Sequence, residues 1–129
     1  MKKGILIDVV KRSVTEIEVT EKISTHIRCE MIEVVELSDT EDIFIDESWR
    51  FNTDNYENGF FKIEGINEPI GSNGLIMGIN HETGESISTS LSVEEVVSKI
   101  TFLTFIPTPK NKGIFFVWNK ESMKTHSNR

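Results

Sequence analysis

Short runs of aliphatic and aromatic residues, separated by polar turns, recur along the whole chain. Residues 4–9 are mostly aliphatic, which is typical of a strand buried on both faces. Residues 14–19 alternate apolar and acidic positions, so we expect a half-exposed strand that pairs back on the first as a hairpin. Further strand-like runs lie at residues 31–37, 43–46, 60–63, 75–79, 86–88, 100–106 and 113–119. Together they predict a mostly antiparallel sheet of about six to eight short strands.

Two stretches have the pattern of short helices. Apolar residues spaced four apart predict an amphipathic helix over 21–29, with Thr20 as its N-cap. A second helix is expected over 93–99, because Ser92 and Glu95 have the spacing of a capping box, in which each side chain bonds the other residue's backbone amide. Combined with the strands, these helices predict an α+β fold.

The length of 129 residues suits a single domain with one core. We expect the α+β core at 1–106 and a basic C-terminal arm at 107–129, which holds the strand at 113–119 and ends in a frayed tail. Every apolar run is far shorter than the roughly 18 residues needed to cross a bilayer. The single cysteine, Cys29, agrees with a reducing compartment, so a cytoplasmic protein is expected.

The net charge of −7 is unevenly distributed: residues 1–13 carry +3, residues 14–57 carry −10, residues 58–98 carry −5 and residues 99–129 carry +5. An acidic first half repels nucleic acid and attracts basic surfaces, so direct nucleic-acid binding is not expected. The acidic residues form either a solvated surface that maintains solubility or an interaction surface that competes with nucleic acid for a basic partner. The candidate residues for such an interaction surface are Glu33, Glu36, Asp39, Glu41 and Asp42.

A glycine-rich loop precedes the apolar run at 75–79, and it consists of Gly71, Ser72, Asn73 and Gly74. Glycines adopt positive φ angles without strain and leave backbone amides exposed, which are the requirements of an anion-binding nest. The loop lacks the Lys-Ser/Thr pair of a P-loop and opens no long helix, so the alternative is a plain turn that leads into a strand. Gly78, inside the run, indicates a close approach of two backbones or a bulge.

Other residues could complete a ligand site around this loop. The non-periodic stretch 47–58 carries aromatic residues that can stack on a nucleotide base or fold onto the sheet of their own domain. Lysines of the C-terminal arm could neutralise phosphate, and His81 would act as an acid or base only if a second titratable group lay beside it. The candidate ligand-binding residues are Gly71, Ser72, Asn73, Gly74, Trp49, Arg50, Tyr56, His81, Lys110 and Lys112.

Candidate catalytic residues are few. His26 and Cys29 lie three residues apart on the first predicted helix, but no further ligand or oriented carboxylate accompanies them, so a core or surface role is expected. The sequence has no nucleophile-elbow motif, no metal-ligand spacing and no convincing carboxylate pair. We therefore predict no catalytic residue, no metal site and no cofactor.

Five segments agree in order and spacing with a known pattern: KGILID at 3–8, CEMIEVV at 29–35, DIFIDE at 42–47, GSNGLIMG at 71–78 and LSVEEVVSKITF at 91–102. With them, the chain resembles an uncharacterised family of small proteins encoded by phages, prophages and plasmids. The resemblance covers about residues 1–105, whereas the loop at 49–56 and the arm after Pro107 depart from it. The family supplies no activity or site residues, and the resemblance implies an intracellular accessory protein of a mobile element in a bacterial host cell.

Three hypotheses for the function follow. The first is a non-catalytic accessory protein of the counter-defence type, which binds and sequesters a host ligand such as a signalling nucleotide. The second is an acidic inhibitor that occludes a basic nucleic-acid-binding surface of a host enzyme. The third, ranked last, is a small enzyme of unknown chemistry. A homodimer formed through an exposed strand edge at 114–118 is a further expectation.

Overall fold

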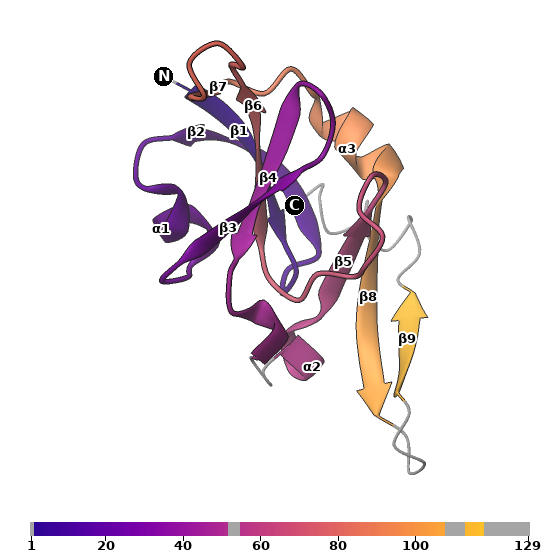
Figure 1. The fold of residues 1–129 in the computed structure, drawn as a ribbon. Helices are drawn as coiled ribbons and strands as arrows, with labels where there is room; N and C mark the ends of the chain where they lie inside the picture. The colour runs from indigo at the N-terminus through magenta and orange to yellow at the C-terminus, as the bar shows by residue number, and fades with distance from the viewer. Residues whose placement is uncertain (1, 52–54, 108–112, 118–129) are drawn as a thin grey trace.

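The computed structural model describes residues 2–51, 55–107 and 113–117, and it confirms the predicted α+β fold of antiparallel strands. In that part of the chain the strands are β1 (Lys2–Asp8), β2 (Ser13–Val19), β3 (Ile32–Glu36), β4 (Glu41–Asp46), β5 (Phe60–Ile63), β6 (Gly74–Ile79), β7 (Ser86–Ile87), β8 (Ile100–Pro107) and β9 (Gly113–Val117). The helices are α1 (Ile23–Ile27), the short 3-10 turn η1 (Trp49–Phe51), α2 (Asn55–Asn58) and α3 (Val93–Lys99). The two predicted helices correspond to α1 and α3, and the strands divide between two sheets (Figure 1).

The larger sheet is built around β6. Its strand order is β2-β1-β6-β4-β3, with β7 pairing at the far end of β6, and all of these pairs are antiparallel. Ile76 of β6 lies opposite Ile5 on one side and Ile43 on the other. A nearly unbroken apolar run suits this central place, because both faces of the strand are covered. The smaller sheet has the order β5-β8-β9.

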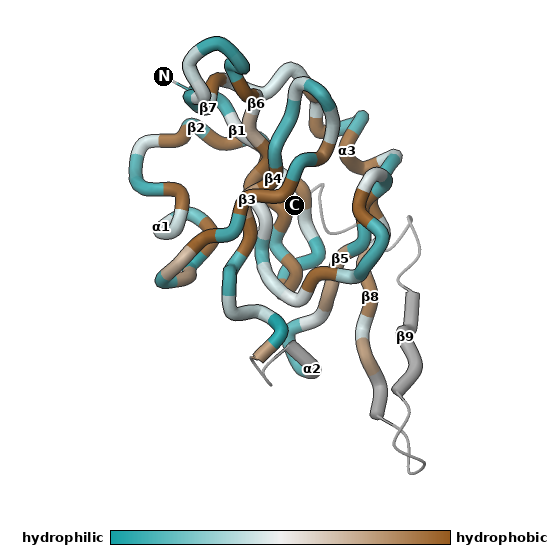
Figure 2. Tube along the Cα trace, in the orientation of Figure 1, coloured by the Kyte–Doolittle hydropathy of each residue, from teal (hydrophilic) through white to brown (hydrophobic). Residues whose placement is uncertain are grey.

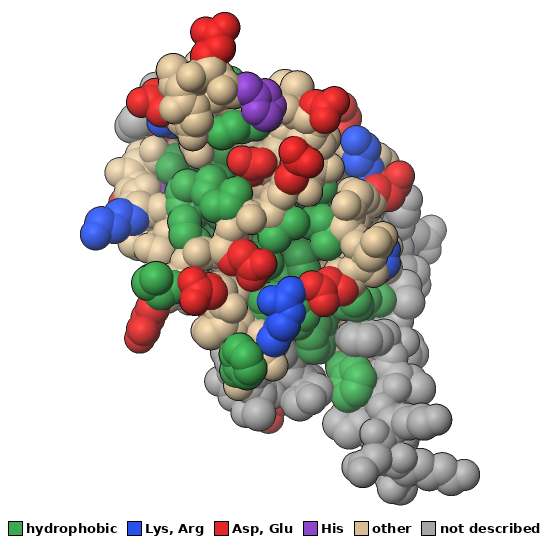
Figure 3. All heavy atoms as spheres, viewed as in Figure 1, with side chains coloured by type: hydrophobic (Ala, Val, Ile, Leu, Met, Phe, Trp, Pro, Cys, Tyr) green, Lys and Arg blue, Asp and Glu red, His purple; other side chains and the backbone are tan. Residues whose placement is uncertain are grey.

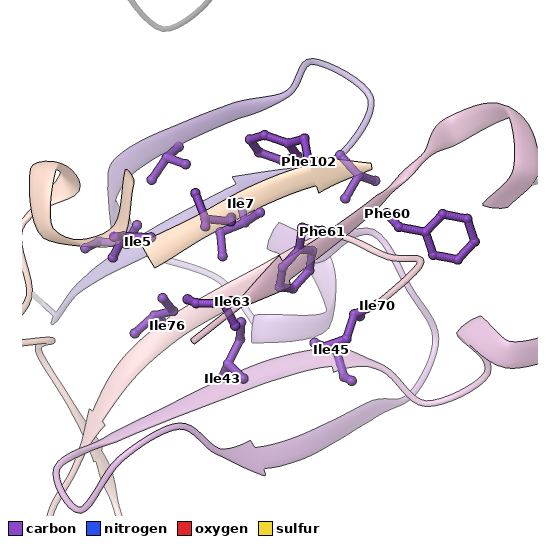
Figure 4. Close-up of a cluster of buried hydrophobic side chains, with 14 of the residues drawn as sticks. Ile5, Ile7, Ile43, Ile45, Phe60, Phe61, Ile63, Ile70, Ile76 and Phe102 are labelled. Atoms are coloured by element: carbon purple, nitrogen blue, oxygen red, sulfur yellow. The ribbon is translucent and has the colours of Figure 1, made fainter. Parts of the chain in front are cut away.

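The main hydrophobic core lies between the two sheets and α3. Alternate residues of β1, β4 and β6 point to this side and meet side chains of β5 and β8 (Figure 4). Phe61 is fully buried there, and Gly74 leaves room for its ring, because a Cβ atom at Gly74 would lie 3.1 Å from Phe61 Cζ. The buried cluster contains Ile5, Ile7, Val9, Val14, Ile43, Ile45, Trp49, Phe60, Phe61, Ile63, Ile70, Ile76, Val96, Ile100, Phe102 and Leu103.

The opposite face of the larger sheet is covered in part by α1. Ile27 of this helix belongs to a second buried cluster with Phe44, Leu75 and Met77. Leu75 and Met77 alternate along β6 with Ile76, which points into the main core. Figure 2 shows the result: hydrophobic residues follow the central strands, and hydrophilic residues occupy the turn between β6 and β7. The period of two along β6 therefore supplies side chains to two separate clusters.

The two main helices begin in different ways. The capping box of α3 is confirmed, since Ser92 Oγ accepts from the Glu95 amide at 3.1 Å and Glu95 Oε1 accepts from the Ser92 amide at 3.0 Å. The predicted N-cap of α1 is wrong: Lys22, not Thr20, takes the N-cap position, and it provides no side-chain cap. The reason is that β2 stays paired as far as Val19, so the residues from Thr20 on are needed to leave the sheet before the helix can begin.

The strand expected near 113–119 corresponds to β9, which pairs along β8 from Gly113 to Val117. Lys110 and Lys112 lie outside the described residues, as does Trp118 at the edge considered for a homodimer. None of the helices in the described part of the chain has the length and the apolar run that a bilayer crossing requires.

Candidate functional site

A pocket of about 260 Å³ opens at the end of the larger sheet where β6 begins. Five segments that are distant in sequence meet there: the turn after β1, the end of α1, the end of β4, the end of α2 and the predicted glycine loop. We call this site the loop pocket. Its lining residues are Asp8, Val9, Val10, Lys11, Ile27, Arg28, Asp46, Asn58, Gly71, Ser72 and Asn73.

The glycine loop is fixed by its own side chains. Ser72 Oγ accepts from the Asp46 amide at 3.2 Å and donates to the Asn73 carbonyl at 2.8 Å. Asn73 Oδ1 accepts from the Val9 amide at 3.0 Å. These bonds attach the loop to the ends of β4 and β1, so the floor of the loop pocket is formed before any ligand arrives.

The predicted anion nest is not formed. Among the described glycines, positive φ angles occur at Gly59, Gly65 and Gly84, and therefore not in the loop at 71–74. Gly74 is instead favoured by packing, since a Cβ atom there would lie 3.0 Å from Ile43 Cδ1 and 3.1 Å from Phe61 Cζ. The loop contributes its position and its polar side chains to the pocket, but not a ring of converging amides.

Two acidic and two basic residues line the loop pocket. Asp8 is 8% exposed, and its Oδ1 accepts from the amides of Val10 and Lys11, both at 3.0 Å. Asp46 Oδ1 accepts from the amide and the hydroxyl of Ser48, each at 2.9 Å. The side chains of Lys11 and Arg28 are exposed at the rim. The pocket thus combines fixed hydrogen-bond acceptors with exposed cations at its opening.

Arg28 has an unusual backbone conformation for an arginine. It ends α1 in the left-handed region, with φ 65° and ψ 56°, and its amide donates to the Ser24 carbonyl. Glycine is the residue that most often occupies this position of a helix end, because a Cβ atom disfavours it. Arg28 was not among the residues predicted from the sequence. The predicted helix has no glycine near its end, which indicates that another residue could take the left-handed position there.

The remaining candidates for ligand binding lie away from the loop pocket. Trp49 is buried, stands edge-on to Phe60 with ring centroids 6.3 Å apart, and carries the Arg50 guanidinium 4.8 Å above its ring. Arg50 also pairs with Glu68 and, at 3.5 Å, with Glu33. Trp49 therefore folds onto its own domain, whereas Phe51 in the same stretch is 87% exposed.

His81 does not line the loop pocket. His81 is exposed in the turn after β6, and its ring bonds the Asp39 carbonyl. It lies at the opposite end of β6 from the glycine loop, roughly 17 Å away at the usual rise of a strand. The side chain of Tyr56 lies outside what the structure describes.

The five residues of the predicted acidic surface differ in exposure. Glu36 and Asp39 are exposed, and Glu33 and Asp42 are half-buried, on the hairpin formed by β3 and β4. Figure 3 shows acidic side chains on this face with hydrophobic side chains between them. Glu41 does not belong to the surface, because it is 2% exposed and bonds to Thr89 and Ser90 inside the molecule.

His26 and Cys29 do not form a catalytic or metal-binding pair. His26 Nε2 accepts from the Glu21 amide at 3.3 Å, and Cys29 Sγ donates to the Met31 carbonyl at 3.3 Å. Across the described residues, no group of three or more His, Cys, Asp or Glu side chains could hold a metal ion. Burial, and secondarily the negative charge of Asp46, raises the pKa of the Cys29 thiol, which disfavours the nucleophilic thiolate.

Cys29 is therefore expected to react with iodoacetamide at pH 8 several-fold more slowly than the same cysteine in the urea-unfolded chain, because only the thiolate is alkylated. The rate should rise with pH through a midpoint above that of the unfolded chain. Equal rates in the folded and unfolded protein would show that the thiol is neither shielded nor shifted.

The candidate residues that the structure brings together are those of the loop pocket, and the other described candidates do not line it. In comparisons with known proteins, no family model, no curated protein and no solved structure matches this chain. The site is therefore interpreted from its own geometry.

Proposed function

We propose that this chain is a non-catalytic binding protein that holds a small anionic ligand of the nucleotide class in the loop pocket. The observation that carries the proposal is the convergence of five distant chain segments on one preformed pocket with Lys11 and Arg28 at its rim. Its volume of about 260 Å³ lies just below the usual range of ligand pockets, so the ligand should be no larger than a single nucleotide unit.

The lining supports this ligand class through three kinds of contact. Arginine and lysine side chains at a rim bind phosphate oxygens through charge-assisted hydrogen bonds. The carboxylates of Asp8 and Asp46 are acceptors for the amino and ring N–H groups of a base. Val9 and Ile27 offer apolar surface to the flat face of a base or to a sugar.

Binding rather than catalysis fits the hydroxyl in the pocket. Ser72 Oγ accepts from the Asp46 amide and donates to the Asn73 carbonyl, so its proton is engaged in the loop. A nucleophilic serine needs a general base at that proton. The resemblance to proteins of phages and plasmids supports a role in which the protein sequesters a host signalling nucleotide inside the bacterial cell.

The test is a thermal-shift screen of the purified protein against linear and cyclic nucleotides at low and high salt. A ligand at about a hundred times its Kd should stabilise the fold by about 2.7 kcal/mol. Since Lys11 and Arg28 contact the phosphate, the shift should shrink as salt rises. A screen without any stabilising nucleotide at either salt concentration would contradict the proposal.

Arg28→Gly is the variant that separates ligand binding from folding. Glycine tolerates φ 65°, so the fold should be as stable as the wild type or more stable by up to about 1 kcal/mol. The affinity for the ligand should nevertheless fall about ten-fold or more, because one charge-assisted contact is lost.

The matched control is Lys22→Ser, which removes one positive charge at the other end of α1 and supplies the missing N-cap. It should leave the ligand affinity unchanged. Retention of full affinity by Arg28→Gly would show that the loop pocket is not the binding site.

A further inference from the structure

A second pocket lies on the other side of the main core, between the end of β3, the turn after β5 and α3. We call it the α3 pocket; its volume is about 190 Å³. Its apolar lining comes from Leu37, Ile63, Leu91 and Val96, and Val96 and Ile63 at its base are 0% and 1% exposed. The polar lining residues are Ser38, Glu64, Gly65 and Lys99.

The walls of the α3 pocket are held in place by backbone contacts. The amides of Leu37 and Ser38 both donate to the Glu41 carbonyl, at 3.0 and 3.1 Å. On the facing wall the Glu64 amide donates to the Lys99 carbonyl at 3.1 Å. The two walls meet closely, since a Cβ atom at Gly65 would lie 2.9 Å from the Leu37 carbonyl oxygen. A partner therefore meets a pocket that needs no ordering, which lowers the cost of binding.

The surface around the α3 pocket is mainly acidic. Asp39 is exposed next to Ser38, and Glu64 is exposed on the facing wall. Lys99 is the cation among the lining residues, and the guanidinium of Arg50 on η1 is already paired with Glu33 and Glu68. Figure 3 shows acidic side chains around a hollow whose floor is hydrophobic.

We propose that the α3 pocket takes one aliphatic or aromatic side chain from a basic, extended segment of a partner protein. A cavity of about 150 Å³ with apolar walls accommodates a benzene ring, so 190 Å³ is sufficient for one large apolar side chain. Lysine or arginine residues on either side of that anchor would face Asp39 and Glu64. This interaction is independent of the loop pocket.

The charges decide between this occupant and two others. A second copy of the chain would place acidic residues against acidic residues if the same surface met itself, which opposes association. A nucleic-acid phosphate would meet the same repulsion. A basic protein segment with one apolar side chain complements both the apolar pocket and the acidic residues around it. The proposal adds a defined anchor to the acidic interaction surface expected from the sequence.

The test uses three synthetic peptides of about nine residues and ¹⁵N-labelled protein. The first peptide alternates lysine and serine around a central leucine, the second has alanine at the centre, and the third replaces lysine with glutamate. The leucine–lysine peptide should bind about ten-fold more tightly than the alanine–lysine peptide, since burial of the longer side chain is lost in the latter. Its amide shifts should concentrate at Ser38, Gly65 and Leu91.

Two other results would overturn the proposal. Equal affinity for the leucine and alanine peptides, or the absence of shifts around the pocket, would show that no side chain enters it. Equal binding of the glutamate–leucine peptide would show that the partner need not be basic.

Variants make the test specific to this surface. Ser38→Trp should fill the pocket from its rim and abolish the preference for leucine over alanine. The double variant Asp39→Lys, Glu64→Lys should weaken the lysine peptide at least five-fold at low salt. The control Glu18→Lys makes one such charge change on β2, at the opposite edge of the sheet, and should leave affinity unchanged. Equal losses in the control and the double variant would reduce the effect to net charge and overturn the site.

Discussion

Replacing Gly78 with alanine is expected to lower the free energy of unfolding by about 3 kcal/mol. A Cβ atom at this position would lie 2.6 Å from the Ser88 carbonyl oxygen and 3.0 Å from Ile87 Cγ1. The nearer atom belongs to the backbone, so β7 must move away from β6 to admit even one methyl group. Urea denaturation should show the loss directly, and the melting temperature should fall by roughly 10 °C.

Gly84→Asn is the matched control for this prediction. Gly84 has φ +76°, and a Cβ atom there would have no neighbour within 4 Å among the described residues. Asparagine is one of the residues that adopts this backbone conformation. The change in stability should therefore stay within about 0.5 kcal/mol. A Gly78→Ala protein that unfolds at the wild-type urea concentration would show that the segment after β7 does not cross β6 closely.

The parts of the fold that could be predicted from the sequence depend on neighbouring residues. The strand at Ser13–Val19 has a period of two, and the capping box of α3 needs only Ser92 and Glu95. Gly78 belongs to this class as well, because a glycine inside an apolar strand indicates a backbone crossing. Local patterns of this kind depend little on where distant segments lie.

The candidate site could be predicted only in part, because pockets are made by distant segments. The loop at 71–73 does line a pocket, but its partners Lys11, Arg28 and Asp46 come from other elements that no local pattern connects to it. Glycine permits a positive φ without requiring one, so the expected nest depended on contacts that the sequence does not reveal. Gly74 is favoured because a larger residue would approach Ile43 and Phe61 too closely, and neither neighbour could be predicted from the sequence.

The burial of Glu41 could not be predicted from the sequence either, because it depends on contacts with a distant segment. In the sequence it is one acid among several in the polar connector between two strands. In the structure it lies opposite Gly78, where the segment after β7 crosses the sheet, and its carboxylate bonds to Thr89 and Ser90. These partners are 48 and 49 residues away along the chain. Gly78 leaves room for the crossing segment, and Glu41 holds it.

Replacing Glu41 with alanine is accordingly expected to destabilise the protein by about 3 kcal/mol. The carboxylate accepts from the Thr89 hydroxyl, from the Ser90 hydroxyl at 3.1 Å and from the Ser90 amide at 3.4 Å. Hydrogen bonds to a charged acceptor contribute more than neutral ones, and their donors would be left without it in a buried region. Urea denaturation measures the loss, with Glu36→Ala as the exposed control, which should change stability by less than about 0.5 kcal/mol.

A double-mutant cycle with Thr89→Val tests whether the bond itself is responsible. Valine matches threonine in shape but lacks the hydroxyl, so Thr89→Val should cost about 1–2 kcal/mol in the wild type and clearly less in the Glu41→Ala background. The same Glu41→Ala protein should lose part of its preference for the leucine peptide, because Thr89 and Ser90 place Leu91 in the wall of the α3 pocket. Strict additivity of the two substitutions would mean that Glu41 stabilises the fold without holding this segment, and the pocket wall would then need another support.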